Sequence, residues 1–349
     1  RRWVGPEFVR DGSELALAEM IRGGQTCFND NYFFPEVTAE CARRAGLRAT
    51  LGIPVLESPN PWTSDFAESL RRGEALADEL ADEPLLRVAL APHAPYSVSD
   101  PALARIREVA AARKMRIHMH VLETDWEIGH SKREFGLRPL QRLDQAGVLN
   151  EQLIAVHMTQ LGGADIALLA ERGVHVVHCP ESNLKLASGI CPVAALLDAG
   201  VNVALGTDGA ASNNDLDLLG EARTAALLAK VSTGDPRAVP AATALDMLTM
   251  GGARALGIDA AVGSIEAGKQ ADLVAVDLDC LEAQPLHDVI SQLVYAVPRS
   301  QVTDVWVAGR AVMRSRELLT LDEDALLATA AEWQQRLLDG ERQVGGAAS

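Results

Sequence analysis

The chain has 349 residues, of which 48% are hydrophobic, and its 32 Lys and Arg against 48 Asp and Glu give a net charge of −16. This length suits one large barrel of roughly 250 residues with a smaller module beside it. Both a nucleic-acid backbone and an anionic membrane need clustered positive charge, so the acidity excludes both as partners. No apolar run reaches the roughly 18 residues of a membrane helix. Five scattered cysteines without a CxxC pair are typical of the reducing cytoplasm, where we expect the protein.

From residue 24 to residue 208, short β-branched apolar runs alternate with amphipathic helical stretches, which is typical of βα units around a parallel sheet. We predict strands at residues 25–30, 48–55, 86–92, 115–121, 153–157, 174–178 and 201–207. A barrel of this type closes with eight strands. The sequence beyond residue 208 is helical, at 215–230 and 238–256, so we expect the first strand of the barrel to be absent from this chain.

The sequence pattern changes after residue 258. A turn-rich segment at 263–272 leads into an apolar run, and residues 302–315 alternate around a glycine turn, which indicates a hairpin. The predicted fold class is α/β, with a (β/α)8 TIM-type barrel that lacks its first strand and the C-terminal part of a small β-sandwich domain. We expect the barrel at 1–258, the remainder of the sandwich at 259–316, and a C-terminal helix and tail at 317–349.

Polar residues stand at the C-terminal ends of the predicted strands, where the active sites of such barrels lie. In chain order they are Asp30, His93, His120 with Glu123, His157, His178 and Asp208. Imidazoles and carboxylates are zinc ligands, and an unliganded glutamate nearby suits general acid–base catalysis. Taken singly, a strand-end histidine is more often a satisfied core residue, and an aspartate there can close an Asx-turn. Their shared position at nearly every strand end favours a functional site.

Two histidines, His118 and His120, imitate the HxH pair that opens many metal-hydrolase barrels. If their strand were the first, only three strands would follow and the barrel could not close, so we reject that interpretation. His118 shares the strand face of His120 but lies one layer deeper, and we favour a structural role for it. The role of His178 stays open, because its side chain can face the pocket or hold the loop that contains Asn183 and Lys185.

Several motifs resemble those of the amidohydrolase superfamily. They are APHAPYSVSD, HMHVLET, LIAVHMTQL, HCPESNLKLASG and GTDGAASNNDLDLLGE. Within the superfamily, the chain is most similar to the 5-methylthioadenosine/S-adenosylhomocysteine deaminases, whose relatives include triazine hydrolases. The resemblance runs over essentially the whole chain, including the returning half of the small β-sandwich. It implies an enzyme that hydrolytically deaminates an adenine nucleoside, by a metal-activated hydroxide, to the inosine analogue and ammonia.

The resemblance also implies a role for individual residues. His120 and Asp208 would ligate one divalent metal per subunit, zinc (Zn²⁺) or alternatively Fe²⁺ or Ni²⁺. Glu123 would protonate the adenine ring nitrogen, Asp208 would pass the water proton to ammonia, and His157 would steady the reacting oxygen. His93, together with Glu123 and Asp208, would contact the substrate. The resemblance further implies a homodimer.

The first strand of the family carries an HxH pair of metal ligands, whereas no histidine precedes His93 in this chain. This departure agrees with the independent strand count. Either the sequence is the remainder of a longer protein or its metal site is crippled. We expect metal to be absent or weakly held, because two ligands do not fill the tetrahedral preference of zinc. Two alternative functions stay open: a related triazine or heterocycle amidohydrolase or chlorohydrolase, and a metal-poor, non-catalytic barrel that binds nucleosides.

Overall fold

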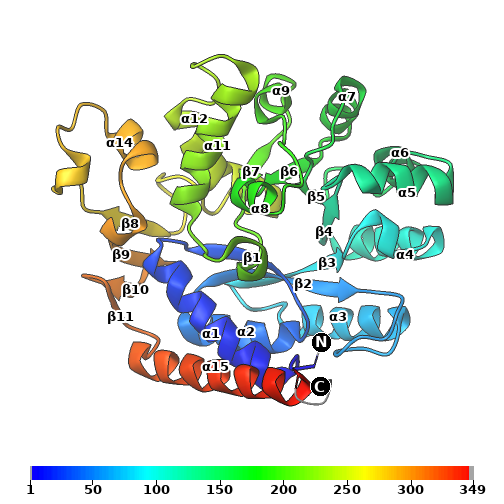
Figure 1. Ribbon diagram of the computed structural model, residues 1–349, viewed down its shortest axis with the longest axis horizontal. Coiled ribbons are helices and arrows are strands. Elements are labelled where there is room, and N and C mark those ends of the chain that lie inside the picture. The colour runs from blue at the N-terminus through cyan, green and yellow to red at the C-terminus, as the bar shows by residue number, and fades with distance from the viewer. Residues whose placement is uncertain (1, 346–349) are drawn as a thin grey trace.

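The computed structural model describes residues 2–345 (Figure 1). Seven parallel strands form one sheet in the order β1-β2-β3-β4-β5-β6-β7. Their bounds are β1 Cys27–Asn31, β2 Arg48–Val55, β3 Leu86–Pro92, β4 Arg116–Val121, β5 Leu153–His157, β6 His175–His178 and β7 Val203–Leu205. All seven predicted strands are confirmed, and their ends differ from the predicted ends by about two residues at most, which is ordinary uncertainty for element boundaries.

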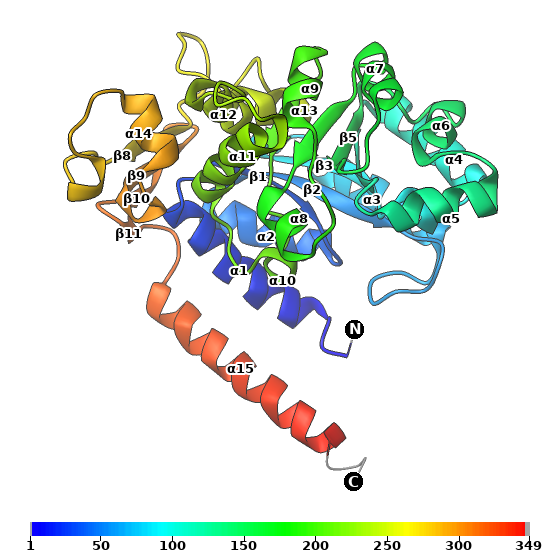
Figure 2. The same ribbon diagram turned by 45° about the horizontal axis from the view of Figure 1, so that its top comes forward.

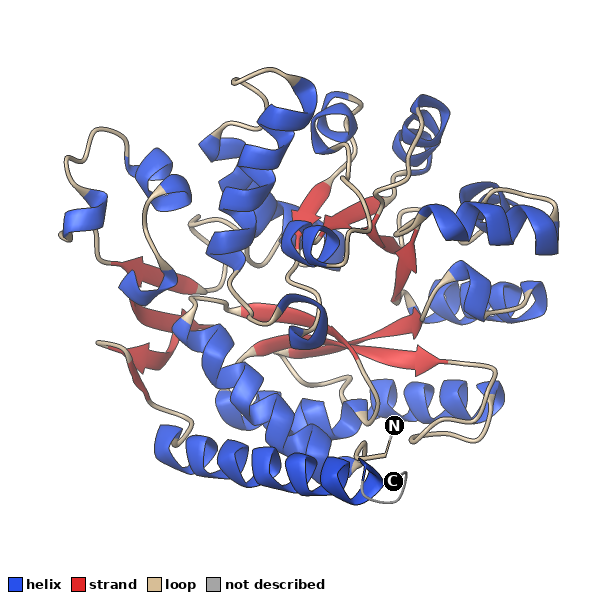
Figure 3. Ribbon diagram, in the orientation of Figure 1, coloured by secondary structure: helices blue, strands red, loops and turns tan. Residues whose placement is uncertain are grey.

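The sheet is an open half-barrel, because among residues 2–345 no strand pairing joins β1 to β7. Figure 3 shows the strands at the centre of the fold with helices around the outside. The predicted α/β fold with a TIM-type barrel that lacks one strand is therefore confirmed. The helices in the described residues are α1 Pro6–Arg22, α2 Pro35–Ala45, α3 Phe66–Glu79, α4 Asp100–Arg113, α5 Asp125–Phe135, α6 Pro139–Gln145, α7 Gly163–Arg172, α8 Pro180–Lys185, α9 Val193–Asp198, α10 Ala210–Asn213, α11 Leu218–Thr233, α12 Ala241–Asp246, α13 Gly252–Leu256, α14 Val289–Tyr295 and α15 Glu323–Gly345.

Strand β2 shows why the sheet forms from this sequence. All eight of its residues are buried, as expected for a strand that is covered on both faces. Leu51 and Ile53 pack in the core beside β1 and β3. Gly52 lets the neighbouring strand approach, because a Cβ atom there would lie 2.2 Å from the carbonyl oxygen of Asp30. The buried strands thus fix the frame from which the strand-end side chains project.

A second, antiparallel sheet follows the barrel, in the order β11-β10-β9-β8. Its strands are β8 Leu273–Val276, β9 Val302–Val307, β10 Arg310–Arg314 and β11 Glu317–Leu318. The predicted hairpin is confirmed between β9 and β10, where Gly309 adopts a φ of 81°. Arg48 at the start of β2 joins the two sheets through a two-pronged ion pair with Asp272, with N–O distances of 3.0 Å.

The C-terminal helix α15 runs alongside α1 (Figure 2). The rings of Phe8 and Trp333 meet edge to face at 5.1 Å, and Nε1 of Trp333 donates a hydrogen bond to Asp11. These contacts anchor the chain's last helix to its first. None of the helices between residues 2 and 345 has the length and apolar character needed to cross a lipid bilayer.

Candidate active site at the strand ends

Three of the predicted site histidines lie together at the C-terminal ends of neighbouring strands. His93 directly follows β3, His120 is the next-to-last residue of β4, and His157 ends β5. The ring centroids of His93 and His120 are 5.0 Å apart, and those of His120 and His157 are 5.5 Å apart with nearly parallel planes. The parallel register of β3, β4 and β5 brings these residues together although 64 positions of sequence separate the first from the last.

One ring nitrogen of His120 is fixed by the backbone. Its Nδ1 donates a hydrogen bond of 2.7 Å to the carbonyl oxygen of His93, which leaves the lone pair of Nε2 available. This is the arrangement by which proteins orient a metal-binding histidine. Burial, followed by the neighbouring His157 and His93, lowers the pKa of His120 to about 4, so its ring is neutral at physiological pH. A neutral imidazole is the form that binds a metal.

His157 is buried and held in an unusual backbone conformation. Its φ is 78°, and that of the following Met158 is 51°, both in the left-handed region that residues with a side chain rarely adopt. Its Nδ1 donates a hydrogen bond of 2.8 Å to Oδ1 of Asn183. The other nitrogen, Nε2, lies 3.8 Å from Oε2 of Glu123. The fold therefore places the Nε2 edge of the His157 ring toward the carboxyl group of Glu123.

Glu123 sits on a short loop after β4 that is fixed by the carboxylate of Glu127. The backbone amides of Leu122, Glu123 and Thr124 all donate hydrogen bonds to that buried carboxylate, at 3.0, 2.7 and 3.2 Å. The side chain of Glu123 accepts a hydrogen bond of 3.0 Å on Oε1 from the hydroxyl of Ser188. Oε2 faces His157 instead, so the two carboxyl oxygens have different surroundings.

Asp208 follows β7 in a left-handed conformation with a φ of 61°. Its Oδ2 accepts a hydrogen bond of 2.8 Å from the hydroxyl of Ser182, and its Oδ1 accepts one of 2.7 Å from the backbone amide of Gly209. The negative charge of Asp208 raises the pKa of His120 and so offsets a part of the lowering that burial causes. The predicted pair of metal ligands thus lies within electrostatic reach of each other.

The remaining strand-end residues take other positions. His118 is buried and its Nδ1 accepts a hydrogen bond from the amide of Asn29, while burial lowers its pKa to about 3. His178 is buried as well, and among the described residues its Nδ1 has no hydrogen-bond partner. Asp30 lies within β1, and its carboxyl group interacts with Thr38 of α2. Burial raises the pKa of Asp30 to about 6. Asp30 therefore belongs to the contact between β1 and α2.

Three residues that the sequence analysis did not single out as site residues hold the predicted ones in place. Ser182, Asn183 and Ser188 each form a hydrogen bond to a different site residue, namely Asp208, His157 and Glu123. All three lie in the HCPESNLKLASG motif, on α8 and the turn after it. The signal that could have found them is the presence of small polar residues directly after a strand that ends at the site.

His120 and Asp208 are of residue types that commonly bind divalent metals. The free Nε2 of His120 and the carboxylate of Asp208 are both typical zinc donors, and each is fixed by a second hydrogen-bonded group. Among the described side chains, which are those of residues 2–340, no three His, Cys, Asp or Glu residues are grouped so that they could hold a metal ion. The described residues therefore match part of a four-ligand zinc set.

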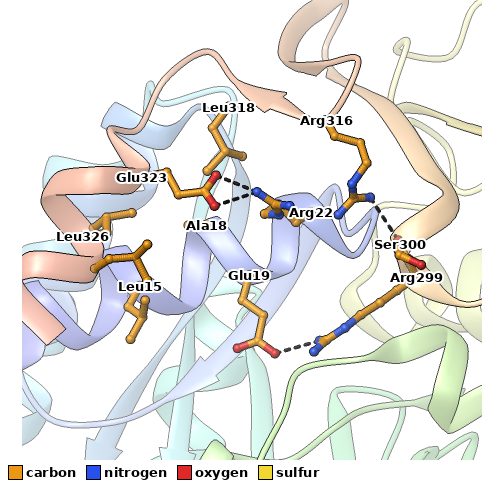
Figure 4. Close-up of a pocket in the computed structure, with 11 residues that line it drawn as sticks. Leu15, Ala18, Glu19, Arg22, Arg299, Ser300, Arg316, Leu318, Glu323 and Leu326 are labelled. Atoms are coloured by element: carbon orange, nitrogen blue, oxygen red, sulfur yellow. Dashed lines mark hydrogen bonds and ion pairs between the residues drawn. The ribbon is translucent and has the colours of Figure 1, made fainter. Parts of the chain in front are cut away.

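A cavity of about 260 Å³ lies elsewhere, between α1, α15 and the C-terminal sheet (Figure 4). It is bordered by two ion pairs, Arg22 with Glu323 at 2.6 Å and Arg299 with Glu19 at 2.7 Å. None of the residues that line it belongs to the strand-end site. We assign this cavity to the packing of α15 against α1 and the second sheet.

A profile of the amidohydrolase family matches residues 3–312. A 5-methylthioadenosine/S-adenosylhomocysteine deaminase from Teredinibacter turnerae is 49% identical over 96% of this chain and 76% of its own length. The deaminase of the same name from Aquifex aeolicus is 40% identical over 96% of this chain and 78% of its own length.

Solved structures agree with these relatives. An adenosine deaminase from Xanthomonas campestris with bound zinc is 54% identical and superposes with a TM-score of 0.96, over 97% of this chain and 77% of that one. A zinc-bound atrazine chlorohydrolase from Arthrobacter aurescens is 26% identical with a TM-score of 0.87, over 94% of this chain and 77% of that one. From the family profile and these relatives, we conclude that the chain belongs to the amidohydrolase family.

Proposed function

We propose that the protein hydrolytically deaminates an adenine nucleoside, 5-methylthioadenosine or S-adenosylhomocysteine, to the inosine analogue and ammonia. The observation that supports it most is the convergence of Glu123, His157 and His120 at one end of the sheet. Relatives that carry the name of this deaminase are 40–49% identical to the chain over most of its length. The reaction is a hydrolysis of a C–N bond in a cyclic amidine.

We propose that His120, through Nε2, and Asp208 are two of the ligands of a zinc ion, with Fe²⁺ or Ni²⁺ as alternatives. When bound, zinc lowers the pKa of water toward neutrality and so provides a nucleophile at pH 7. The donors are of the right kind, and each is oriented by a hydrogen bond to a neighbouring group. Both carboxylate oxygens of Asp208 accept hydrogen bonds, which hold the group in a fixed orientation.

In this proposal Glu123 delivers a proton to the ring nitrogen beside the amine-bearing carbon. Its Oε1 accepts the hydrogen bond from the hydroxyl of Ser188, so in this proposal Oε2 is the oxygen that carries the proton. His157 hydrogen-bonds the attacking oxygen through Nε2, because its Nδ1 is occupied by Asn183. Asp208 takes one proton from water and passes it to the departing ammonia, and the second water proton goes to Glu123 as the product carbonyl forms, which restores the proton that Glu123 gave to the ring. His93, which lies against His120, contacts the substrate together with Glu123 and Asp208.

The test is ammonia release from 5-methylthioadenosine, S-adenosylhomocysteine and adenosine, beside a panel of triazines. General acid catalysis contributes about 10²–10⁴ in rate. We therefore expect Glu123→Gln to lower turnover by at least about 100-fold and to leave the zinc content unchanged, as measured by elemental analysis. Turnover that survives this change would show that another residue supplies the proton.

The triazine panel addresses the alternative that the same residues remove chloride or an amine from another heterocycle. The likeness to atrazine chlorohydrolase is real but lower, at 26% identity against 54% for the adenosine deaminase structure. We therefore expect turnover of nucleosides and little or none of triazines. Binding of nucleosides without turnover of any substrate would support a non-catalytic barrel instead.

Three further predictions belong to this proposal. The barrel would span 1–258, the remainder of the β-sandwich 259–316, and the C-terminal helix and tail 317–349. The active form would be a homodimer, which light scattering of the purified protein measures directly. The protein would act in the cytoplasm, where five unpaired cysteines suit the reducing conditions.

A further inference from the structure

A group of aromatic side chains lies next to the candidate active site on its outer side. Trp126 and His130, one turn apart on α5, stack with ring centroids 4.6 Å apart and planes 16° from parallel. Tyr96, on the 3-10 turn Pro95–Ser97, meets the ring of Trp126 edge to face at 5.3 Å and that of His130 at 6.3 Å. We call Tyr96, Trp126 and His130 the aromatic cluster.

The aromatic cluster is continuous with the site histidines. The ring of Tyr96 lies edge to face with His93 at 5.9 Å, and His93 lies 5.0 Å from His120. Trp126 is only three residues after Glu123, and the same buried Glu127 fixes the loop before it. A row of rings therefore runs from His120, past His93 and Tyr96, to Trp126.

The outer end of this row is open to solvent. Trp126 keeps 54% of its surface exposed and Tyr96 keeps 37%. A single exposed aromatic residue needs no explanation, but aromatic rings that touch one another beside an active site form an apolar patch of the kind that binds ligands. About half of the Trp126 surface is therefore free to contact a ligand.

The direction of the row indicates which part of the substrate it meets. The amine-bearing ring must lie beside Glu123, His157 and Asp208, because these groups perform the chemistry in the proposed function. The 5′ end of the nucleoside is opposite that ring and points away from the buried groups. The rings of Tyr96 and Trp126 continue the row from His93, the proposed substrate contact, toward solvent, so they are the side chains placed to meet that end.

We infer that the aromatic cluster is a subsite for the 5′-thioether of the nucleoside and that Trp126 determines specificity for it. The inference rests on the proposed function, since it assumes that the adenine ring reacts at Glu123. A thioether sulfur is polarisable and contacts aromatic rings favourably. The 5′-hydroxyl of adenosine is strongly hydrated and has no such affinity for an apolar ring. The cluster thus favours thioether nucleosides over adenosine.

The test compares kcat/KM for 5-methylthioadenosine with kcat/KM for 5′-deoxyadenosine, which has the same base and the same ribose ring but lacks the methylthio group. Sulfur–aromatic contacts correspond to about a twofold to tenfold effect. We expect Trp126→Ala to lower kcat/KM for the thioether by about threefold to tenfold and for 5′-deoxyadenosine by less than about twofold. Trp126→Phe, which keeps a ring at this position, should retain most of the preference.

Lys132→Ala provides a matched control, because Lys132 is an exposed residue on the same helix outside the aromatic cluster. It should leave both values unchanged, and a thermal melt shows whether each variant is folded. Equal losses on both substrates, or no loss with Trp126→Ala, would overturn the subsite. A wild-type protein that deaminates none of the nucleosides would overturn the proposed function itself, which is a separate and recognisable result.

Discussion

Ser188 donates a hydrogen bond of 3.0 Å to Oε1 of Glu123, although the two residues are 65 positions apart in the chain. The hydroxyl of Ser182 donates a similar hydrogen bond to Asp208, and the side-chain oxygen Oδ1 of Asn183 accepts one from His157. One short segment, α8 and the turn after it, therefore contacts three of the proposed catalytic residues, Glu123, Asp208 and His157. Such supporting contacts hold catalytic side chains within a few tenths of an ångström of their working positions.

We expect Ser188→Ala to lower kcat by about tenfold or more and to change KM little. Loss of this hydrogen bond lets the carboxyl group of Glu123 leave its position, and a small displacement of a catalytic group can cost about tenfold or more in rate. Steady-state ammonia release measures both constants. The control is Ser232→Ala, which removes an exposed hydroxyl near the end of α11. If Ser188→Ala raised KM alone, the serine would contribute to substrate binding and not to the placement of Glu123.

The hydrogen bond between Asn183 and His157 gives a second prediction. Without the amide oxygen, the buried Nδ1–H group of His157 has no partner, at a cost of about 1–3 kcal/mol. We expect Asn183→Ala to lower kcat by about 10-fold to 100-fold, because the ring is then free to change its tautomer and orientation. Nitrogen NMR of the histidine ring reports the tautomer directly. An unchanged tautomer together with unchanged kcat would remove Asn183 from the positioning group.

Much of the fold was predictable because its signals are local. The strands β2 and β3 are apolar runs bounded by polar turns, and their predicted ends at 48–55 and 86–92 are the observed ones. The predicted helix at 238–256 is interrupted by a π-helical segment at Met247–Gly251. Local periodicity cannot show this segment, because it depends on a contact with β7. A Cβ atom at Gly251 would lie 2.5 Å from the carbonyl oxygen of Val203.

The candidate site, like the fold, was predictable only in part. The positions of His93, His120 and His157 follow from the rule that parallel strands end at one edge of a sheet. The partners of these residues do not follow from any such rule, because Ser188 and Asn183 reach the site through the path of a loop. The left-handed φ of His157 is also invisible in the sequence, since surrounding contacts impose it on an ordinary residue.

The ion pair between Arg48 and Asp272 gives a stability prediction. Both side chains are nearly inaccessible, at 8% and 4% exposure, and Gln270 also accepts a hydrogen bond from the guanidinium at 2.7 Å. Removal of one partner leaves a buried charge without compensation, which costs about 3–5 kcal/mol. We therefore expect Asp272→Ala to lower the free energy of unfolding by about that amount, as measured by chemical denaturation.

The control for this change is Asp235→Ala, which breaks the ion pair with the well-exposed Arg237. Solvent screens an exposed pair of this kind, so we expect Asp235→Ala to change stability little. Similar losses in the two variants would mean that the contact between β2 and the second sheet is not stabilised by the buried charge pair.

Glu221 gives a prediction of how stability depends on pH. It lies fully buried on α11 and accepts hydrogen bonds from the backbone amide of Glu181 and the side chain of Asn213. Burial raises its pKa from 4.5 to about 8. Between these two values the folded protein retains a proton that the unfolded chain has lost, so stability falls as the pH rises. Below pH 4.5 both states are protonated, and above pH 8 both are ionised, so the slope vanishes on either side.

We therefore expect Glu221→Gln to reduce the loss of stability between pH 5 and pH 8, by at most about 1.4 kcal/mol for each pH unit. Glutamine keeps a carbonyl oxygen for Asn213 but cannot ionise, so any difference from wild type should grow steadily across this window. Chemical denaturation at intervals of half a pH unit measures it. Parallel stability curves for the two proteins would mean that Glu221 does not hold its proton in the folded state.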